Sequence, residues 1–283
     1  MCRWNAYFGQ PLVIDELLYR TQHGLIDQSL HARQGVETTN GDGFGVGWYA
    51  TRDAVAPGRY RSVTPAWNDQ NLRDLASHIE SPLFLAHIRA TTGTPVQQTN
   101  CHPFRHGRWL FVHNGVLNGF HLYRRELMLA LDPAVFDGLG GSTDSEALFY
   151  LALTFGLESD PLGALEQAVG FVEAKGREHG VDYPVQGTFG ISNGERLWGV
   201  RYSSEHASRT LYLSADRQTV QALHPDNPRF QRMTDEDRMI VSEPLSDLPG
   251  VWIAVPESTA LVIQPGVDEQ VPFEPRMPAL ATA

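Results

Sequence analysis

The sequence predicts an α+β fold built from antiparallel sheets. Segments rich in β-branched and aromatic residues lie on both sides of a helical middle, and they do not alternate regularly with helices as in a parallel sheet. Asn193-Gly194 separates two such segments, and this dipeptide is typical of a two-residue hairpin turn. The 283 residues suit one domain, which we place at 1–271, followed by a proline-rich and loosely held tail over 272–283.

The N-terminal part is predicted to contain strands with short helices between them. Residues 2–8 alternate apolar and aromatic side chains and predict a strand. A helical pattern opens at Pro11 and continues to residue 18, and a second short helix is expected over 25–30. Glycines alternate with larger residues over 40–49, which predicts a strand with one bare face. A phosphate-binding loop would require a helix directly afterwards.

The remaining elements follow from periodicity and from turn residues. We expect helices over 72–79, 120–131, 145–157 and 162–178, and strands over 83–90, 109–113, 185–192, 197–203, 211–214, 239–242, 251–255 and 261–263.

The composition excludes several classes of protein. A net charge of −11 argues against nucleic acid or an anionic membrane as the main partner. Cys2 and Cys101 are the two cysteines, which excludes a disulfide scaffold and suits the reducing cytosol. Polar residues interrupt the N-terminal apolar run, so we expect no signal peptide, and no stretch approaches the roughly 18 apolar residues of a membrane span. We therefore expect a cytoplasmic protein.

The chain begins Met1-Cys2-Arg3, and the thiol at the second position has two interpretations. It is either an ordinary residue after the initiator or a nucleophile exposed by removal of Met1. In the second case Cys2 carries a thiol and a free α-amine, whose ordinary pKa values are about 8.5 and about 7.7–8.0. A nucleophile and its general base would then belong to one residue.

Three further positions carry candidate chemistry. Arg89 follows an apolar strand, where a guanidinium can bind a carboxylate with two hydrogen bonds. Asn114-Gly115 ends a predicted strand and is either a plain turn or an amide and an N–H group that form an oxyanion hole. Asp144 precedes a predicted helix and is either its N-cap or a ligand for an ammonium group.

Two other patterns carry little weight. Cys101, His102, His106 and His113 have no common zinc-site spacing, so we expect no metal site. Residues 190–194 match the G-x-S-x-G nucleophile motif, but a strand follows where that motif requires a helix.

Taken together, eight segments resemble the class II glutamine amidotransferases of the N-terminal nucleophile hydrolase superfamily. The resemblance is closest to the stand-alone subgroup that includes ergothioneine-pathway γ-glutamyl hydrolases and the amidotransferase-like subunit of glutathione degradation. The segments are 1–3, 40–49, 64–67, 86–89, 99–104, 113–115, 141–146 and 241–244.

This resemblance implies a four-layer αββα sandwich of two antiparallel sheets. It implies an enzyme that cleaves the γ-amide of glutamine or of a γ-glutamyl compound through a thioester, without a cofactor. The residues that it implies are Cys2, Asn114 and Gly115 for catalysis, and Arg89, Thr92, His102 and Asp144 for substrate binding.

Two departures from the synthase-type members concern the leaving group. Those members carry Trp after the arginine and His after the threonine, where this chain has Ala90 and Gly93. The smaller side chains favour an amine larger than ammonia. A protein partner that accepts ammonia or supplies a peptidase fits the resemblance as well. The alternative from another class is a non-catalytic γ-glutamyl-binding or regulatory subunit of a larger complex.

Overall fold

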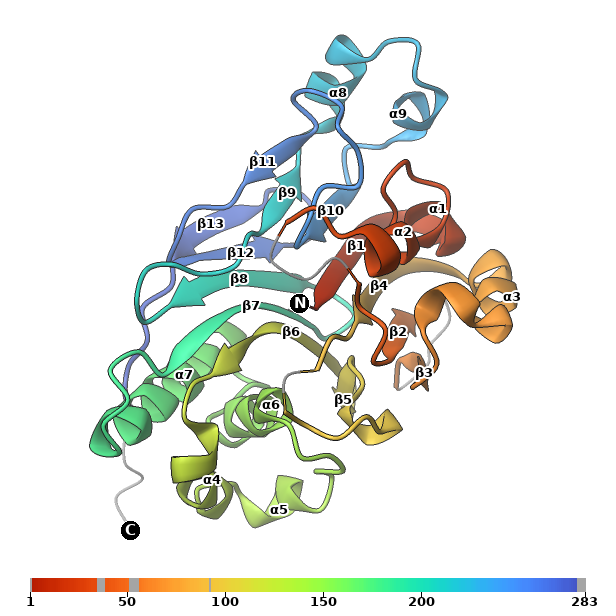
Figure 1. The fold of residues 1–283 in the computed structure, drawn as a ribbon. Helices are drawn as coiled ribbons and strands as arrows, with labels where there is room; N and C mark the ends of the chain where they lie inside the picture. Colours follow the sequence, from red (N-terminus) through yellow and green to blue (C-terminus); the bar gives the residue numbers. More distant parts are fainter. Residues whose placement is uncertain (1, 35–38, 51–55, 92, 279–283) are drawn as a thin grey trace.

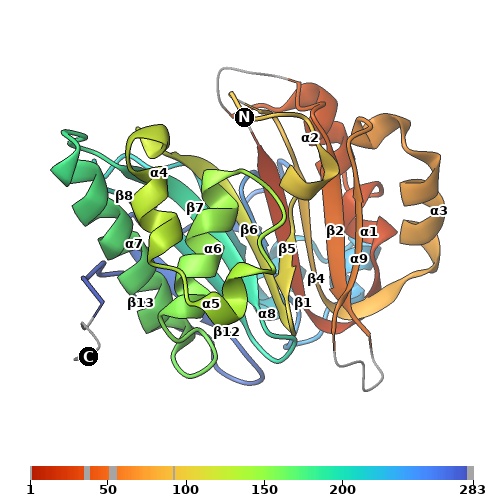
Figure 2. The same ribbon diagram turned by 90° about the horizontal axis from the view of Figure 1, so that it is seen from below.

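The computed structural model describes residues 2–34, 39–50, 56–91 and 93–278. Two antiparallel sheets pack face to face, and helices cover the outer face of each sheet (Figures 1 and 2). In Figure 2 the layers follow one another from α4–α7, through the two sheets, to α1–α3. The expected four-layer αββα sandwich is confirmed.

The first sheet has seven strands in the order β11-β9-β10-β1-β4-β2-β3. Its strands in chain order are β1 (Arg3–Val13), β2 (Phe44–Tyr49), β3 (Gly58–Ser62), β4 (Glu80–Ile88), β9 (Tyr212–Ser214), β10 (Arg238–Val241) and β11 (Trp252–Ala254).

The second sheet has six strands in the order β13-β12-β8-β7-β6-β5. Its strands in chain order are β5 (Phe104–His106), β6 (Trp109–Leu117), β7 (Val185–Ser192), β8 (Leu197–Ser203), β12 (Thr259–Ile263) and β13 (Glu269–Pro272). The hairpin that Asn193-Gly194 predicts is present between β7 and β8.

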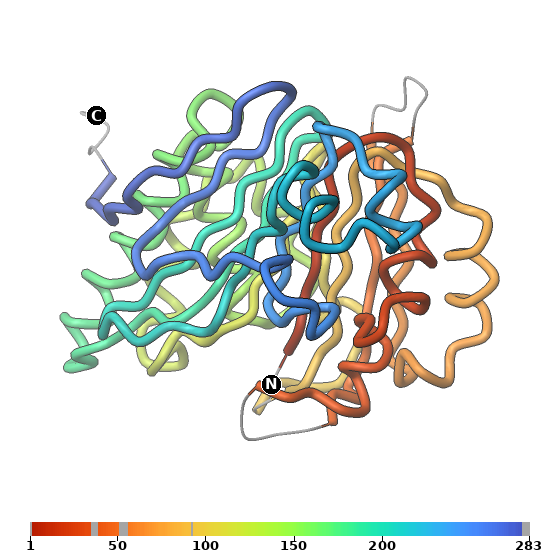
Figure 3. Tube along the Cα trace, turned by 90° about the horizontal axis from the view of Figure 1, so that it is seen from above, coloured from red at the N-terminus to blue at the C-terminus, as the bar shows by residue number. Residues whose placement is uncertain are grey.

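Among the described residues, three helices cover the first sheet, four cover the second, and two lie between β9 and β10 in the sequence. The helices are α1 (Asp15–Leu18), α2 (Leu25–His31), α3 (Gln70–His78), α4 (Phe120–Leu129), α5 (Pro133–Phe136), α6 (Asp144–Thr154), α7 (Pro161–Glu178), α8 (Arg217–Leu223) and α9 (Pro228–Arg232), with 3₁₀ turns at Ala66–Asn68 and Gln98–Asn100. Seen from above (Figure 3), α8 and α9 lie over the end of β1 that is opposite to the N-terminus. None of the helices in the described ranges is long and apolar enough to cross a membrane.

The apolar layer between the sheets fixes which side of β1 faces inward. Trp4 and Ala6 lie fully buried in this layer with Leu85 of β4 and Leu110 of β6. Because successive side chains of a strand point to opposite faces, Cys2 is directed to the same inner side as Trp4. β1 pairs with β4 on one side and β10 on the other, so the start of β1 is held at the end of the inter-sheet layer.

The helix expected from Pro11 is wrong over its first part. β1 continues to Val13, because Leu12 and Val13 pair with Ser81 and Glu80 of β4 after an irregularity in the register. The helical pattern survives as the single turn Asp15–Leu18. Pairing with a neighbouring strand has overridden the local preference.

Two other expectations change at the ends of elements. β6 continues to Leu117, so Asn114 and Gly115 lie inside a strand and not at its end. The tail was expected to be loosely held from residue 272, yet Phe273 is buried and the Arg276 guanidinium forms an ion pair with Glu166 of α7. Residues 279–283 lie outside the described ranges.

Leu110→Ala tests the inter-sheet layer. Leu110 is fully buried, so truncation removes apolar contacts and leaves a cavity between the sheets. We expect the free energy of unfolding to fall by about 2–5 kcal/mol, measured by urea denaturation. Leu129→Ala on α4 is the control, because Leu129 is 68% exposed. Equal losses from the two variants would contradict this description of the core.

Candidate functional site

Cys2 lies immediately before β1, with its thiol against the main chain of Ala90. The Cys2 Sγ is 3.4 Å from the Ala90 carbonyl oxygen, to which it donates, and 3.4 Å from the Ala90 nitrogen, from which it accepts. Two residues later, the Trp4 indole donates to the Thr188 hydroxyl at 2.9 Å across the two sheets. Thr188 pairs with Asn114 of β6. These contacts tie the start of β1 in one sheet to the part of the other sheet that contains Asn114.

The environment of Cys2 keeps its thiol protonated at neutral pH. Burial raises the pKa of the Cys2 thiol above its ordinary value, and the nearby Asp144 carboxylate acts in the same direction. The hydrogen bond with Ala90 and the positive charge of Arg89 lower the pKa but do not outweigh burial. Both charged residues are thus close enough to act on the thiol, and a base must accept its proton during any attack on a carbonyl carbon.

Arg89 is a buried cation, and only 3% of its surface is exposed. Its guanidinium donates to the hydroxyls of Thr91 at 3.1 Å and Thr94 at 2.5 Å, and to the Asp42 carbonyl at 3.5 Å. Within the described ranges no carboxylate forms an ion pair with it. A buried guanidinium held by neutral oxygens favours an anion, because a carboxylate would offset the cost of its desolvation.

Asp144 begins α6, but it is not the N-cap. Thr143 occupies that position and its hydroxyl accepts from the Glu146 nitrogen at 3.1 Å, so the N-cap interpretation of Asp144 is wrong. The Asp144 carboxylate accepts from the nitrogens of Leu117 and Ser145, each at 2.8 Å. These contacts fix the carboxylate between the end of β6 and the start of α6, beside Cys2.

Asn114 and Gly115 are paired with Thr188 and Gly187 of β7, so the plain-turn interpretation is wrong. On its other side, β6 pairs with β5 only over Trp109–Phe111. Because the N–H groups of a strand point alternately to its two sides, part of β6 beyond Phe111 has N–H groups directed away from β7. A Cβ at Gly115 would lie 2.0 Å from the Gln186 carbonyl oxygen and 2.4 Å from the His113 Nε2, so the position has no room for a side chain.

His102 is buried behind the site. Its ring lies against that of His87 with centroids 4.1 Å apart, and both of its nitrogens are without a hydrogen-bond partner in the described chain. Burial lowers the pKa of His102 well below 6.5, so the ring is neutral. Thr92, the other residue expected to line the pocket, lies outside the described ranges.

The cysteine and histidines considered as a metal cluster diverge. His113 bonds to the Ser145 hydroxyl at 2.8 Å and stacks on Phe189, whereas Cys101 bonds to the main chain. Within the described residues no group of three or more His, Cys, Asp or Glu side chains is placed to hold a metal ion.

Comparison with known proteins identifies the family. The family model of class II glutamine amidotransferases matches residues 21–279. The chain belongs to the class II glutamine amidotransferases. The amidotransferase is similar to the probable glutamine amidotransferase DUG3 of Saccharomyces cerevisiae, with 31% identity over 93% of this chain and 82% of that protein. It is also similar to the gamma-glutamyl-hercynylcysteine sulfoxide hydrolase of Mycolicibacterium smegmatis, with 30% identity over 87% of this chain and 100% of that one.

Solved structures agree with this assignment. A glutamine aminotransferase class-II domain protein from Silicibacter pomeroyi is 33% identical, with a TM-score of 0.74 over 97% of this chain and 100% of that chain. The glutamine phosphoribosylpyrophosphate amidotransferase of B. subtilis shares the fold, with a TM-score of 0.66 at 14% identity over 98% of this chain and 50% of that one. The family match and the named relatives show that the protein is an enzyme.

Sequence reasoning missed three residues that hold Arg89 and its neighbouring segment in place. Thr91 and Thr94 bind the guanidinium of Arg89, and the Asp42 carboxylate accepts from the Thr91 nitrogen at 2.8 Å. Asp42 lies in the glycine-rich segment that the resemblance included, so its presence was signalled but its role was not. The two threonines lie only two and five residues after Arg89, but no motif in this segment indicates that their hydroxyls bind its guanidinium.

A separate cavity of about 470 Å³ lies on the outer side of the first sheet. It is lined by the end of β1, by α1 and α9, and by residues between 245 and 252. None of the predicted site residues lines it. This cavity is therefore separate from the predicted site at the start of β1.

Gly115→Ala tests the geometry of β6. The added methyl group would collide with main-chain and imidazole atoms, so we expect a free energy of unfolding lower by about 1–3 kcal/mol, measured by urea denaturation. Gly140→Ala is the matched control, because a Cβ there meets only the Thr99 methyl group at 3.9 Å. Unchanged stability of Gly115→Ala would show that the strand lies differently.

Proposed function

We propose that this enzyme hydrolyses γ-glutamyl amides, with Cys2 as the nucleophile and the Cys2 α-amine as the general base. The family match begins at residue 21, so the role of Cys2 is argued from geometry. The observation that carries the proposal is that the Cys2 thiol lies close enough to a buried cation, Arg89, and to a carboxylate, Asp144, for both charges to act on it. A γ-glutamyl group carries an α-carboxylate and an α-ammonium, which these two charges complement.

The proposed reaction has two steps. The Cys2 sulfur attacks the γ-carbonyl carbon while its proton passes to the α-amine of the same residue. The side-chain amide of Asn114 and the Gly115 N–H stabilise the negative oxygen of the tetrahedral intermediate. The resulting α-ammonium returns the proton to the departing amine as the C–N bond breaks and the thioester forms. Water then attacks the thioester, which releases glutamate and restores the thiol.

The leaving side of the site favours an amine larger than ammonia. Gly93 has a φ of +94°, and a Cβ built there would meet no atom within 4 Å. The neighbouring Ala90 contacts the nucleophile through its main chain, so its side chain adds only a methyl group to this wall. The similarity to a γ-glutamyl-hercynylcysteine sulfoxide hydrolase supports a γ-glutamyl compound as substrate. A protein partner remains a prediction from the resemblance.

A substrate panel tests the activity and its nucleophile together. We expect chain that begins at Cys2 to release glutamate from at least one of glutamine, glutathione and other γ-glutamyl amides. Chain that retains Met1 should be nearly inactive, because its Cys2 nitrogen is an amide and cannot accept the thiol proton. Intact-mass spectrometry identifies the N-terminus, and Cys2→Ala is the inactive reference.

Equal turnover by verified Met1-Cys2 chain would eliminate the α-amine as the base. Glutamate release by Cys2→Ala would eliminate the thiol. Binding of γ-glutamyl compounds without any release would favour the non-catalytic alternative.

We call Arg89 and Asp144 the clamp, because they are proposed to bind the two charged groups of the substrate. Mutations in the clamp and in the oxyanion hole should have different effects. Arg89→Ala and Asp144→Ala should each lower kcat/KM for every γ-glutamyl substrate, because each leaves a charge of the substrate unpaired. The loss should correspond to about 2 kcal/mol or more of transition-state stabilisation. Asn114→Ala should chiefly lower kcat, by about 10²–10³-fold. Exposed Arg105→Ala, whose guanidinium bonds to the Pro57 carbonyl, is the control for loss of a cation. Loss confined to one substrate would remove Arg89 and Asp144 from the clamp, and a pure KM effect would remove Asn114 from the oxyanion hole.

A further inference from the structure

The segment 241–244 belongs to the resemblance, yet it has no role in the mechanism described above. Its Glu243 is 1% exposed and follows β10, the strand that pairs with β1. The pairing continues past the end of β10, because the Ser242 nitrogen donates to the Trp4 carbonyl at 3.0 Å and the Ser242 hydroxyl accepts from the Trp4 nitrogen at 3.0 Å. Arg3 precedes Trp4 and Glu243 follows Ser242, so the two residues lie side by side in this antiparallel pairing. Their side chains form an ion pair.

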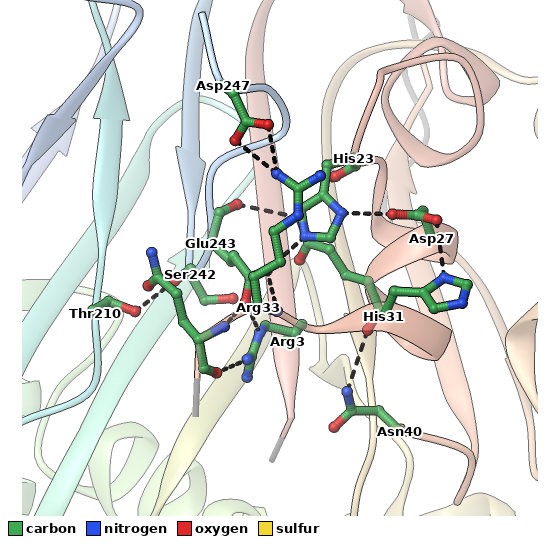
Figure 4. Close-up of polar contacts among 12 residues, drawn as sticks. Arg3, His23, Asp27, His31, Arg33, Asn40, Thr210, Ser242, Glu243 and Asp247 are labelled. Carbon is green, nitrogen blue, oxygen red and sulfur yellow. Dashed lines mark hydrogen bonds and ion pairs between the residues drawn. The ribbon is translucent and has the colours of Figure 1, made fainter. Parts of the chain in front are cut away.

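One carboxylate gathers four donors from three segments of the chain (Figure 4). The Glu243 Oε2 accepts from the Arg3 Nε at 2.7 Å and the Gln34 nitrogen at 3.1 Å. Its Oε1 accepts from the His23 Nε2 at 2.6 Å and the Arg33 nitrogen at 2.8 Å. Glu243 therefore ties the start of β1 to the segments on both sides of α2.

His23 is a cation in this arrangement. Its Nε2 contacts Glu243 and its Nδ1 contacts Asp27 at 2.5 Å, and ionised carboxylates only accept hydrogen bonds, so both ring nitrogens donate. Burial opposes the charge, but the two hydrogen bonds raise the pKa of His23 above 6.5, although Arg33 lowers it. Burial likewise opposes the charge of Glu243, but its donors and Arg3 lower that pKa to about 2.

The network ends on the nucleophile residue itself. The Arg3 Nη1 donates to the Cys2 carbonyl oxygen at 3.0 Å, and its Nη2 donates to the Gln34 carbonyl. In chain that begins at Cys2, no preceding peptide orients this residue, so its carbonyl and side-chain contacts determine where its thiol and amine point. For Cys2 these contacts are Arg3 on the carbonyl and Ala90 on the thiol.

We propose that Glu243 is a positioning residue for the Cys2 nucleophile, acting through the guanidinium of Arg3. This inference rests on the proposed function, since it concerns the orientation of the thiol and α-amine of Cys2. Burying Arg3, His23 and Glu243 is not an efficient way to stabilise a fold, because well-packed apolar side chains do so without desolvating charges. The network instead fixes the plane of the Cys2 carbonyl group. Misplacement of a reacting group by about 1 Å lowers the rate on the order of 10²-fold.

The test compares two network variants with one remote control. Glu243→Gln keeps the shape but places an NH₂ group against N–H donors. Arg3→Lys keeps the positive charge beside Glu243 but replaces the fork that reaches three oxygens with one ammonium group. Glu173→Gln is the control, because Glu173 on α7 is also buried and accepts from the Tyr202 hydroxyl at 2.7 Å, on the outer side of the second sheet.

We expect both network variants to lower kcat for the panel substrate that wild type hydrolyses fastest, by about tenfold or more. KM should stay within about threefold, because Arg89 and Asp144 are untouched. Glu173→Gln should lose thermal stability while kcat stays within about twofold of wild type. If Glu243→Gln does not fold, Arg3→Lys decides the question, since it retains the charge pair.

Three results would overturn the inference. Retention of wild-type kcat by both network variants, a rise in KM alone, or a loss of kcat that parallels loss of stability in all three variants would each do so. Wild-type chain that releases no glutamate from any panel member would contradict the proposed function, and this inference with it. Active wild type with unaffected variants would contradict this inference alone.

Discussion

The structure depends on the hydrogen bonding of β1 to strands on both sides. β4 and β10 hold β1 in the middle of the seven-stranded sheet, and Trp4 fixes which of its faces packs against the second sheet. A strand held in this way cannot slip by one residue without turning its apolar side chains outward. The pairing of β1 therefore fixes where the strand begins, and Cys2 lies directly before that point at the edge of the sandwich.

Within the part of the chain that the structure describes, the fold satisfies the hydrogen bonds of Arg89 and Asp144 but does not neutralise their charges. Arg89 is enclosed by the hydroxyls of Thr91 and Thr94 and by a carbonyl, which satisfy its hydrogen bonds but not its charge. Asp144 is held by main-chain N–H groups, which fix its position in the same manner. Neutral partners orient each group, and the opposite charges of a ligand can then complete the two sites.

The two ionic arrangements near Cys2 differ in what they leave open. In the network around Glu243, cations and carboxylates lie in direct contact, so its charges are paired within the chain. At Arg89 the charge faces only neutral oxygens within the described residues. The first arrangement suits a structural or positioning task on the outer side of β1, and the second suits the binding of a charged molecule on its inner side.

The sequence by itself determined the antiparallel α+β class, the positions of most strands and helices, and the family, because these follow from periodicity, turn residues and short motifs. It named Cys2, Arg89 and Asp144 together, and the structure places Arg89 and Asp144 close enough to Cys2 to shift its pKa. Only the tertiary structure decided that Leu12 and Val13 continue a strand, since pairing with β4 outweighs the local helical pattern. Only the structure also excluded Asp144 as the N-cap, assigned Thr91 and Thr94 to Arg89, and brought His23 to Glu243. Those contacts join residues far apart in the chain or depend on the path of a turn, and no local pattern specifies either.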